Sequence, residues 1–237
     1  MTQNNNEEMN KDEMHVKEVN LEQENLEEDQ PQIQYKTVIG ITGITGSGTS
    51  TVSNMLKSLG GLYISADQLA HEIILKGGIA YNEVIQAFGK LILQKDGEIN
   101  RKTLGTVVFK NQDRLKILEG IIHPGVKTHI HQMLTDKYIV RNYVENNFAI
   151  IDAPLLVESE LNTLCSHVCL VTAPDATRVE RIVARDGLAP HAIRERISTR
   201  KGDDFLKPHA QFIIENNADL ASLESQVRHM ATTLGLA

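Results

Sequence analysis

The chain has 237 residues, of which 41% are hydrophobic and 23% charged, a composition ordinary for a globular protein with a sizeable core. It contains no apolar run of about 18 residues that could span a bilayer, and its N-terminus lacks the basic start and apolar core of a signal peptide. These features exclude a membrane-spanning or secreted class, so we expect a cytoplasmic protein with one main domain and no membrane partner.

The first 34 residues differ sharply from the rest in charge. Residues 1–34 carry ten acidic and two basic side chains, a net charge of −8, which leaves +1 for the remainder. This segment has no aromatic residue and is rich in Asn, Gln and Glu, so it cannot bury enough apolar surface to offset the entropy of ordering it. We predict a disordered acidic tail; the alternative is a short amphipathic helix around Met14, Val16 and Val19 that docks on a partner.

From Tyr35 onward, short apolar runs alternate with helical patterns. Residues 37–42 (TVIGIT) form a β-branched run typical of a buried parallel strand. A glycine-rich loop follows, and residues 50–59 then place apolar side chains at helical spacing until Gly60-Gly61 ends the helix. Further strands are predicted at 62–65, 148–152, 168–171 and 212–215. This alternation indicates an α/β fold in which a parallel five-stranded sheet is covered by helices on both faces.

The stretch 68–147 contains no comparable strand and is predicted to be a mainly helical insertion that holds a second substrate. Helices are expected at 80–88, 103–109 and 114–122, and His123-Pro124 should interrupt the last of these before a further helix begins. Cys165 and Cys169 lie four residues apart in an apolar segment, where a reduced, buried pair is favoured over a disulfide or metal site.

The loop after the first strand reads GITGSGTS and closely matches the phosphate-binding pattern G-x-x-x-x-G-K-[ST]. Gly43, Gly46 and Gly48 let the backbone approach a polyanion, toward which consecutive N–H groups and a helix N-terminus point. Ser50 supplies a hydroxyl suited to Mg²⁺, but Thr49 stands where the pattern has its lysine. We interpret the loop as a nucleotide site; the plainer alternative is a tight strand-to-helix connection.

Two further patterns point to phosphate chemistry. Asp152 ends an apolar strand beside the loop, where a carboxylate can orient Mg²⁺ through water or, alternatively, cap the turn before Pro154. Arg178, Arg181 and Arg185 are spaced i, i+3 and i+7, so one helix face carries three guanidinium groups. Such a face is usually solvated, but beside a phosphate site it suits a mobile lid that closes over the transferring group. The near-neutral charge of residues 35–237 and their few aromatic side chains argue against a nucleic-acid partner.

Taken together and in order, a set of segments closely resembles the dephospho-coenzyme A kinases across essentially all of residues 37–220. These segments are GITGITGSGTSTV, ADQLAHEI, GGIAYNEVIQAFG, DGEINRKTLGTVVF, LEGIIHP, IIDAPLLVES, RVERIVARDGL and IIENNADL. The resemblance implies a three-layer phosphate-loop kinase fold over 35–237, with a helical acceptor-binding insertion at 68–147 and a lid at 186–209. It also implies transfer of the ATP γ-phosphoryl group, with Mg²⁺, to the ribose 3′-hydroxyl of dephospho-coenzyme A. We expect a monomer.

The resemblance also assigns site residues. Asp67 matches the acceptor-side aspartate that would orient or deprotonate the 3′-hydroxyl, and Arg181 and Arg185 match the lid arginines. Positions near the acceptor are matched by Arg101, His123 and Pro124. The implied nucleotide-binding residues are Gly43, Gly46, Ser47, Gly48, Thr49, Ser50, Thr51 and Asn216, with Ser50 and Asp152 for the metal and Asn217 also near the adenine.

The sequence departs from the family pattern at four positions. Thr49 replaces the lysine, Ser65 replaces the first aspartate of D-A-D, and Arg178 and Arg200 stand where glutamine is expected. Losing a donor aimed at developing charge costs about 10²- to 10³-fold in rate, so we hypothesise that Arg178 or Arg200 supplies the missing charge. The blander alternative is that these arginines face solvent and that Thr49 marks a weak enzyme. The competing functions are a nucleotide- or coenzyme-A-binding regulatory paralogue and an interaction module that acts through the acidic tail.

Overall fold

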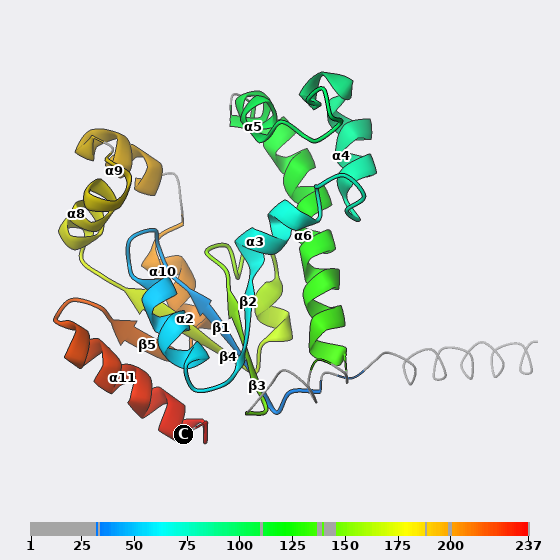
Figure 1. Cartoon of the computed structure of the whole chain (residues 1–237). Coiled ribbons are helices and arrows are strands. Elements are labelled where there is room, and N and C mark those ends of the chain that lie inside the picture. Colours follow the sequence, from blue (N-terminus) through cyan, green and yellow to red (C-terminus); the bar gives the residue numbers. More distant parts are fainter. Residues whose placement is uncertain are drawn as a thin grey trace, which may run out of the picture. The chain divides into compact units, whose positions relative to one another are not determined.

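The computed structural model describes residues 32, 34–109, 111–136, 139, 146–187, 189–198 and 201–236. The predicted acidic tail therefore lies almost wholly outside the described residues, as does Arg200. From Gln34 onward the chain clusters as one compact unit, and the elements below all belong to it (Figure 1).

A five-stranded parallel sheet forms the centre of this unit and confirms the predicted architecture. Its strands follow the spatial order β2-β3-β1-β4-β5, and every neighbouring pair is parallel. The strands are β1 (Thr37–Thr42), β2 (Leu62–Ser65), β3 (Phe148–Asp152), β4 (His167–Thr172) and β5 (Phe212–Glu215). Because the strands are parallel, all their carboxyl ends lie at one edge of the sheet, where ligands bind in this class of fold.

The inner strands read as continuous apolar runs because helices cover both sheet faces. Every residue of β1 and β3 is buried. On one face, Ile39 and Ile41 pack with side chains of α2 (Thr49–Lys57) and α11 (Leu220–Thr233). On the other, Val38 and Ile151 belong to a core shared with α3 (Ala66–Glu72) and α6 (Gln112–Thr135). These two cores establish the three-layer arrangement.

The helical segment between β2 and β3 is built on α6. It also contains α4 (Tyr81–Phe88), a 3-10 turn η1 (Lys90–Ile92) and α5 (Arg101–Phe109), which lie beside α6 in Figure 1. Ile73, the residue after α3, packs closely on α6 at Gly125, where a Cβ would lie 3.1 Å from Ile73 Cδ1. The predicted helical character of this segment is correct.

The predicted break at His123-Pro124 is wrong. Pro124 lies inside α6, which runs unbroken for 24 residues from the N-cap Asn111. Proline lacks an N–H and its ring crowds the carbonyl four residues earlier, a cost of about 3 kcal/mol in a helix interior. Here the residue four positions earlier is Gly120, and Ile121 and Val126 on either side of the proline are buried in the core. Tertiary burial therefore overrides the local penalty.

The chain after β3 forms smaller elements around the ends of the strands. A 3-10 turn, η2 (Leu161–Leu164), precedes β4; α8 (Asp175–Asp186), α9 (Pro190–Ser198), α10 (Asp203–Leu206) and the 3-10 turn η3 (Lys207–His209) follow it. α8 and α9 pack through Val179, Ile182 and Ile193.

Both cysteines are free thiols, as predicted. Cys169 is fully buried in β4 and Cys165 is half-buried before it. In the part of the chain that the structure describes, no helix has the length and apolar character needed to cross a bilayer.

Candidate active site

The glycine-rich loop joins the carboxyl end of the central strand β1 to the start of α2. Gly46 and Gly48 have φ of 88° and 100°, values that residues with a Cβ atom rarely adopt. A Cβ on Gly43 would lie 2.4 Å from the Val171 carbonyl oxygen, so this glycine is required by the close approach of β4. The geometry matches the strand, loop and helix that a phosphate loop requires.

Asn216, the residue that follows β5, is hydrogen-bonded to this loop. The Asn216 side chain is buried, and its amide donates a hydrogen bond of 2.8 Å to the Ser47 carbonyl oxygen. A Cβ on Gly48 would lie 2.2 Å from the same amide nitrogen, so the two residues are in close contact. The structure thus brings the predicted residues Ser47, Gly48 and Asn216 together.

Arg181 lies directly against the loop. Its guanidinium donates to the carbonyl oxygens of Gly46 and Ser47 at 3.4 Å each and to the backbone and side-chain oxygens of Asn216 at 3.2 Å each. The Arg181 guanidinium therefore lies beside the loop, in contact with its backbone oxygens. Arg185 behaves differently: it is exposed and pairs with Asp186, whose hydrogen bond raises the pKa of the arginine.

Thr49 starts α2, and its side chain points back over the loop. Its Cγ2 lies 3.2 Å from the position of a Cβ on Gly43. Ser50 and Thr51 follow in the first turn of α2, both exposed. The first turn offers hydroxyls and backbone N–H groups to an anion, but Thr49 contributes no charge at the position of the pattern's lysine.

Asp152 lies at the neighbouring strand end and is 8% exposed. The Tyr63 hydroxyl donates a hydrogen bond of 3.2 Å to its Oδ2. Burial raises the pKa of Asp152 and the nearby negative charge of Asp67 adds to the rise, whereas the hydroxyls of Ser53 and Tyr63 oppose it. Ser65 faces Asp152 in the register of β2 and β3, which brings the start of α3 to this carboxylate.

Asp67 lies exposed in the first turn of α3, at the edge of a cavity. Its charge also acts on His71, one turn later on the same helix: burial and the positive charge of Arg101 lower the pKa of His71, and Asp67 opposes them. The charges of Asp67 and Arg101, two of the predicted site residues, therefore both act on His71.

The cavity beside Asp67 has a volume of about 150 Å³ and is enclosed by α3, α6 and the segment after β3. His123 lines it together with Ser159. Both residues also line an adjoining pocket of about 410 Å³, which contains Pro124 and Lys127. His123 therefore lines a cavity with Asp67, whereas Pro124 lines only the neighbouring pocket, and the two hollows share His123 and Ser159.

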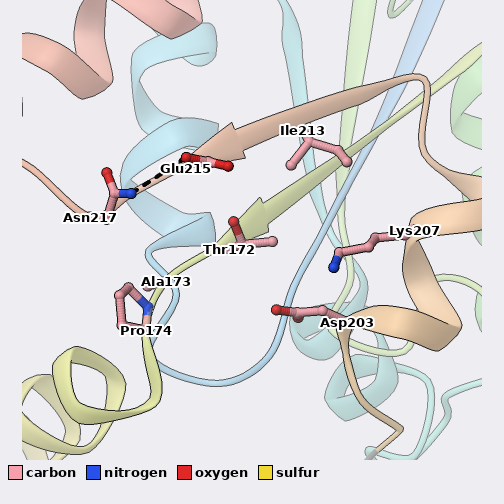
Figure 2. Close-up of a pocket in the computed structure, with 8 residues that line it drawn as sticks. All are labelled: Thr172, Ala173, Pro174, Asp203, Lys207, Ile213, Glu215 and Asn217. Atoms are coloured by element: carbon pink, nitrogen blue, oxygen red, sulfur yellow. Dashed lines mark hydrogen bonds between the residues drawn. The ribbon is translucent and has the colours of Figure 1, made fainter.

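A separate pocket of about 310 Å³ opens at the carboxyl ends of β4 and β5 (Figure 2). Thr172 and Glu215 come from the strand ends, and Asp203 and Lys207 from α10 and the turn after it (Figure 2). The Asn217 amide donates to a Glu215 carboxylate oxygen at 3.4 Å.

The arginine series does not form one solvated face. Arg178 is buried, Arg181 contacts the loop and Arg185 is exposed. The spacing correctly indicates a helix, but not which neighbours each position meets.

Sequence reasoning also missed Tyr63, His71 and Asp203. Tyr63 sits in a predicted strand two residues before Ser65, and His71 lies four residues after Asp67, so strand and helix periodicity could have singled out both. Asp203 lies 3.9 Å from the Arg178 guanidinium, and no sequence signal links these two residues.

The sequence model of the family described as dephospho-CoA kinase matches residues 37–222. A dephospho-CoA kinase from Carboxydothermus hydrogenoformans is 34% identical over 190 residues, covering 80% of this chain and 90% of the relative. The dephospho-CoA kinase of Bacillus cereus is 34% identical over 191 residues, covering 81% of this chain and 94% of the relative.

Solved structures give the same result. TT1252 from Thermus thermophilus superposes with a TM-score of 0.69 at 28% identity, covering 84% of this chain and 98% of that one. Dephospho-CoA kinase from Campylobacter jejuni gives 0.60 at 27% identity, covering 83% and 96%. Family match, curated relatives and fold agree, and the chain belongs to the dephospho-CoA kinase family.

Proposed function

We propose that the protein transfers the γ-phosphoryl group of ATP to the ribose 3′-hydroxyl of dephospho-coenzyme A, giving coenzyme A and ADP. The observation that carries this proposal is the meeting of two sites at one edge of the sheet. The phosphate loop leaves β1, the adjacent strand β3 ends in Asp152, and the β2–β3 register sets Ser65 opposite Asp152, two residues before Asp67. Family membership supplies the acceptor.

On the donor side, we infer that backbone N–H groups of the loop and the N-terminus of α2 bind the ATP phosphates. Arg181 adds a guanidinium, which suits a multiply charged phosphate because this planar group can donate several hydrogen bonds at once. Asn216 holds the loop in shape through Ser47. The adenine is proposed to lie toward Asn216 and Asn217.

On the acceptor side, Asp67 is proposed to orient the 3′-hydroxyl and accept its proton. The hydroxyl oxygen then forms a bond to the γ-phosphorus while the bond from that phosphorus to the ADP oxygen breaks, with the three groups in line. Arg101, His123 and Pro124 are proposed to position the rest of the acceptor. His123 lines the cavity beside Asp67, Pro124 lines the neighbouring pocket, and the charge of Arg101 acts on His71 of α3.

Ser50 and Asp152 are the residues that would hold Mg²⁺. The donor set fits, because Mg²⁺ keeps most of its waters and takes one or two protein oxygens with the substrate phosphates. Bound there, the cation would neutralise charge on the phosphates. Asp152 suits this role because it is a carboxylate at the end of β3, beside the strand that leads into the phosphate loop.

The regulatory paralogue that Thr49 suggested is not favoured by the family match and the relatives. The hypothesis that Arg178 replaces the missing lysine is weakened, because its guanidinium contacts the carboxylates of Asp175 and Asp203. Arg200 lies outside the described residues. Arg181 is the cation seen at the loop, and we infer that it carries part of the missing charge.

The test is an assay of the purified full chain with Mg-ATP and dephospho-coenzyme A. We expect equal amounts of coenzyme A, measured by chromatography, and ADP, measured by a coupled assay. Coenzyme A as the acceptor is the matched control, because its 3′-hydroxyl is already phosphorylated and no ADP should form. Saturable binding of both substrates without product would instead support the regulatory paralogue.

Four further assignments accompany this function as proposals. We infer that residues 68–147 bind the acceptor and that 186–209 act as the lid. We also propose a monomer, which sedimentation can test, and a cytoplasmic location, where ATP is available.

A further inference from the structure

Arg178 is unusual because its charged side chain is almost fully buried, although the residue lies next to the phosphate loop. It is 6% exposed in the first turn of α8. Arginine is seldom buried to this extent unless its charge is paired. The surroundings of its guanidinium therefore decide what it does.

Two carboxylates surround this guanidinium. One terminal nitrogen donates to Asp175, whose own side chain is 82% exposed. The other terminal nitrogen lies 3.9 Å from an Asp203 oxygen, and the Asp203 side chain is 24% exposed. Among the described residues, neither that nitrogen, nor the arginine Nε, nor the Asp203 oxygen has a hydrogen-bond partner. Asp203 is thus the more buried counter-charge, and its contact with Arg178 is an ion pair at 3.9 Å without a hydrogen bond.

The backbone of Arg178 packs directly on the phosphate loop. A Cβ on Gly46 would lie 2.8 Å from the Arg178 carbonyl oxygen and 3.1 Å from its Cα. Three residues later on α8, Arg181 donates to the carbonyl oxygens of Gly46 and Ser47. Any movement of the first turn of α8 would therefore move the Arg181 guanidinium relative to the loop.

Asp203 provides the second point of attachment. It begins α10, which leads through Lys207 toward β5, and it faces the strand-end pocket in Figure 2. The ion pair therefore joins α8, which follows β4, to α10, which precedes β5. Both ends of the pair are anchored at the sheet edge that carries the loop.

We propose that Arg178 is a positioning residue: its ion pair with Asp203 holds the first turn of α8 against Gly46 and so aims Arg181 at the phosphates of bound ATP. This rests on the proposed function, in which ATP occupies the loop. Arg178 does not itself bind phosphate, because its charge is matched by carboxylates. The arrangement matters more in this chain than in one with the pattern's lysine, because Thr49 leaves Arg181 as the charge seen at the loop.

The test measures equilibrium affinity for Mg-ATP without acceptor, and coenzyme A formation in parallel, for Asp203→Asn, Arg181→Met and the double variant. Asp203→Asn should weaken ATP affinity about 10-fold, because even a displacement of about 1 Å can cost on the order of 10²-fold in an active site. The same substitution should cost little more once Arg181 is gone, because effects that act through one group are not additive. Asp203→Glu keeps the charge and should retain most of the affinity.

Asp204→Asn is the matched control, because Asp204 is the next residue of α10 and its 99% exposed side chain pairs only with Lys207 at 3.4 Å in the described structure. Exposed pairs contribute little, so ATP affinity should not change. Arg178→Met is made as well, and thermal melting shows whether it folds; Asp203→Asn carries the test if it does not.

Three results would overturn the proposal. Asp203→Asn could behave like Asp204→Asn, or could cost the same with and without Arg181. It could also tighten ATP binding, as expected if a released Arg178 itself bound phosphate. A wild-type chain that forms no coenzyme A, yet shows the coupling between Asp203 and Arg181 in ATP affinity, would refute the proposed function and leave the positioning role standing.

Discussion

The side chain of Asn216 and the backbone of Ser47, 169 residues apart in the chain, are joined by a buried hydrogen bond of 2.8 Å. This contact fixes the phosphate loop to the end of β5. The same asparagine accepts hydrogen bonds from Arg181, so a single side chain connects the loop, the last strand and α8.

We expect Asn216→Ala to lower the free energy of unfolding by about 1 to 3 kcal/mol, because it leaves buried polar groups without a partner. The KM for ATP should rise as the loop loosens. Urea unfolding and steady-state kinetics measure the two effects. Asn217→Ala is the control for stability, because Asn217 is exposed and its hydrogen bond to Glu215 is long, at 3.4 Å; equal losses of stability from both variants would contradict the role of Asn216.

Gly48→Ala should reduce stability and ATP binding together. Gly48 has a φ of 100°, and a Cβ there would lie 2.2 Å from the Asn216 amide. A strained left-handed residue alone costs about 1 to 3 kcal/mol, and the clash adds to this. Gly120→Ala is the contrasting variant: Gly120 lies inside α6 with nothing within 4 Å of its Cβ position, so alanine should be neutral or stabilising. Thermal melting of both variants settles the point, and a Gly48→Ala protein as stable as wild type would refute it.

Thr49→Lys should raise kcat for coenzyme A formation. A donor aimed at developing charge is worth about 10²- to 10³-fold in rate; because Arg181 already lies at the loop, we expect a gain of about 10-fold. Thr49→Met is the control, because it supplies similar length without charge. The idea fails if lysine and methionine give the same kcat.

Asp67→Asn should lower kcat by about 10²- to 10⁴-fold, the range in which a positioned acid or base contributes. The KM for ATP should change little if Asp67 acts on the acceptor, as proposed, because it lines the cavity with His123 rather than the phosphate loop. Glu72→Gln tests whether any lost charge on α3 has the same effect, since Glu72 ends that helix and is exposed. A kcat that survives in Asp67→Asn would remove Asp67 from the proposed mechanism.

The two thiols should resist alkylation in the folded protein. Burial raises the pKa of Cys165 and of Cys169 from 9.0 to about 12, so neither forms thiolate at pH 8. Each thiol is buried in its neutral form, so its folded pKa is higher than its unfolded pKa. The free energy of unfolding is therefore unaffected by these thiols below pH 9 and falls as the pH rises from 9 toward 12, because the unfolded chain then forms thiolates. Mass spectrometry after iodoacetamide should show both sites unmodified in the native state and modified in urea. Fast labelling of native Cys169 would show that β4 is not buried as described.

The sequence was sufficient to predict the sheet and the loop, but not the contacts that arise between distant segments. Buried parallel strands appear in the sequence as unbroken apolar runs, and glycines mark where the loop needs positive φ, so both features can be predicted from a short stretch of sequence. The uninterrupted α6 cannot be predicted in this way, because Pro124 is tolerated through burial of Ile121 and Val126. Likewise, the i, i+3, i+7 spacing predicts a shared helix face, but the burial of Arg178 depends on Asp203 in a later helix.

The central position of β1 has a consequence for the order in which the protein can mature during synthesis. Among the strands that the structure describes, β1 is the first to be made, yet its neighbours in the sheet are β3 and β4, and Val38 hydrogen-bonds Ser166, 128 residues later. The hydrogen bond from Asn216 to Ser47 joins residues 169 positions apart, so it forms later still. A nascent chain therefore carries the complete phosphate-loop sequence long before Asn216 can hold that loop in shape, and a phosphate ligand would meet the finished loop only after β5 has been made.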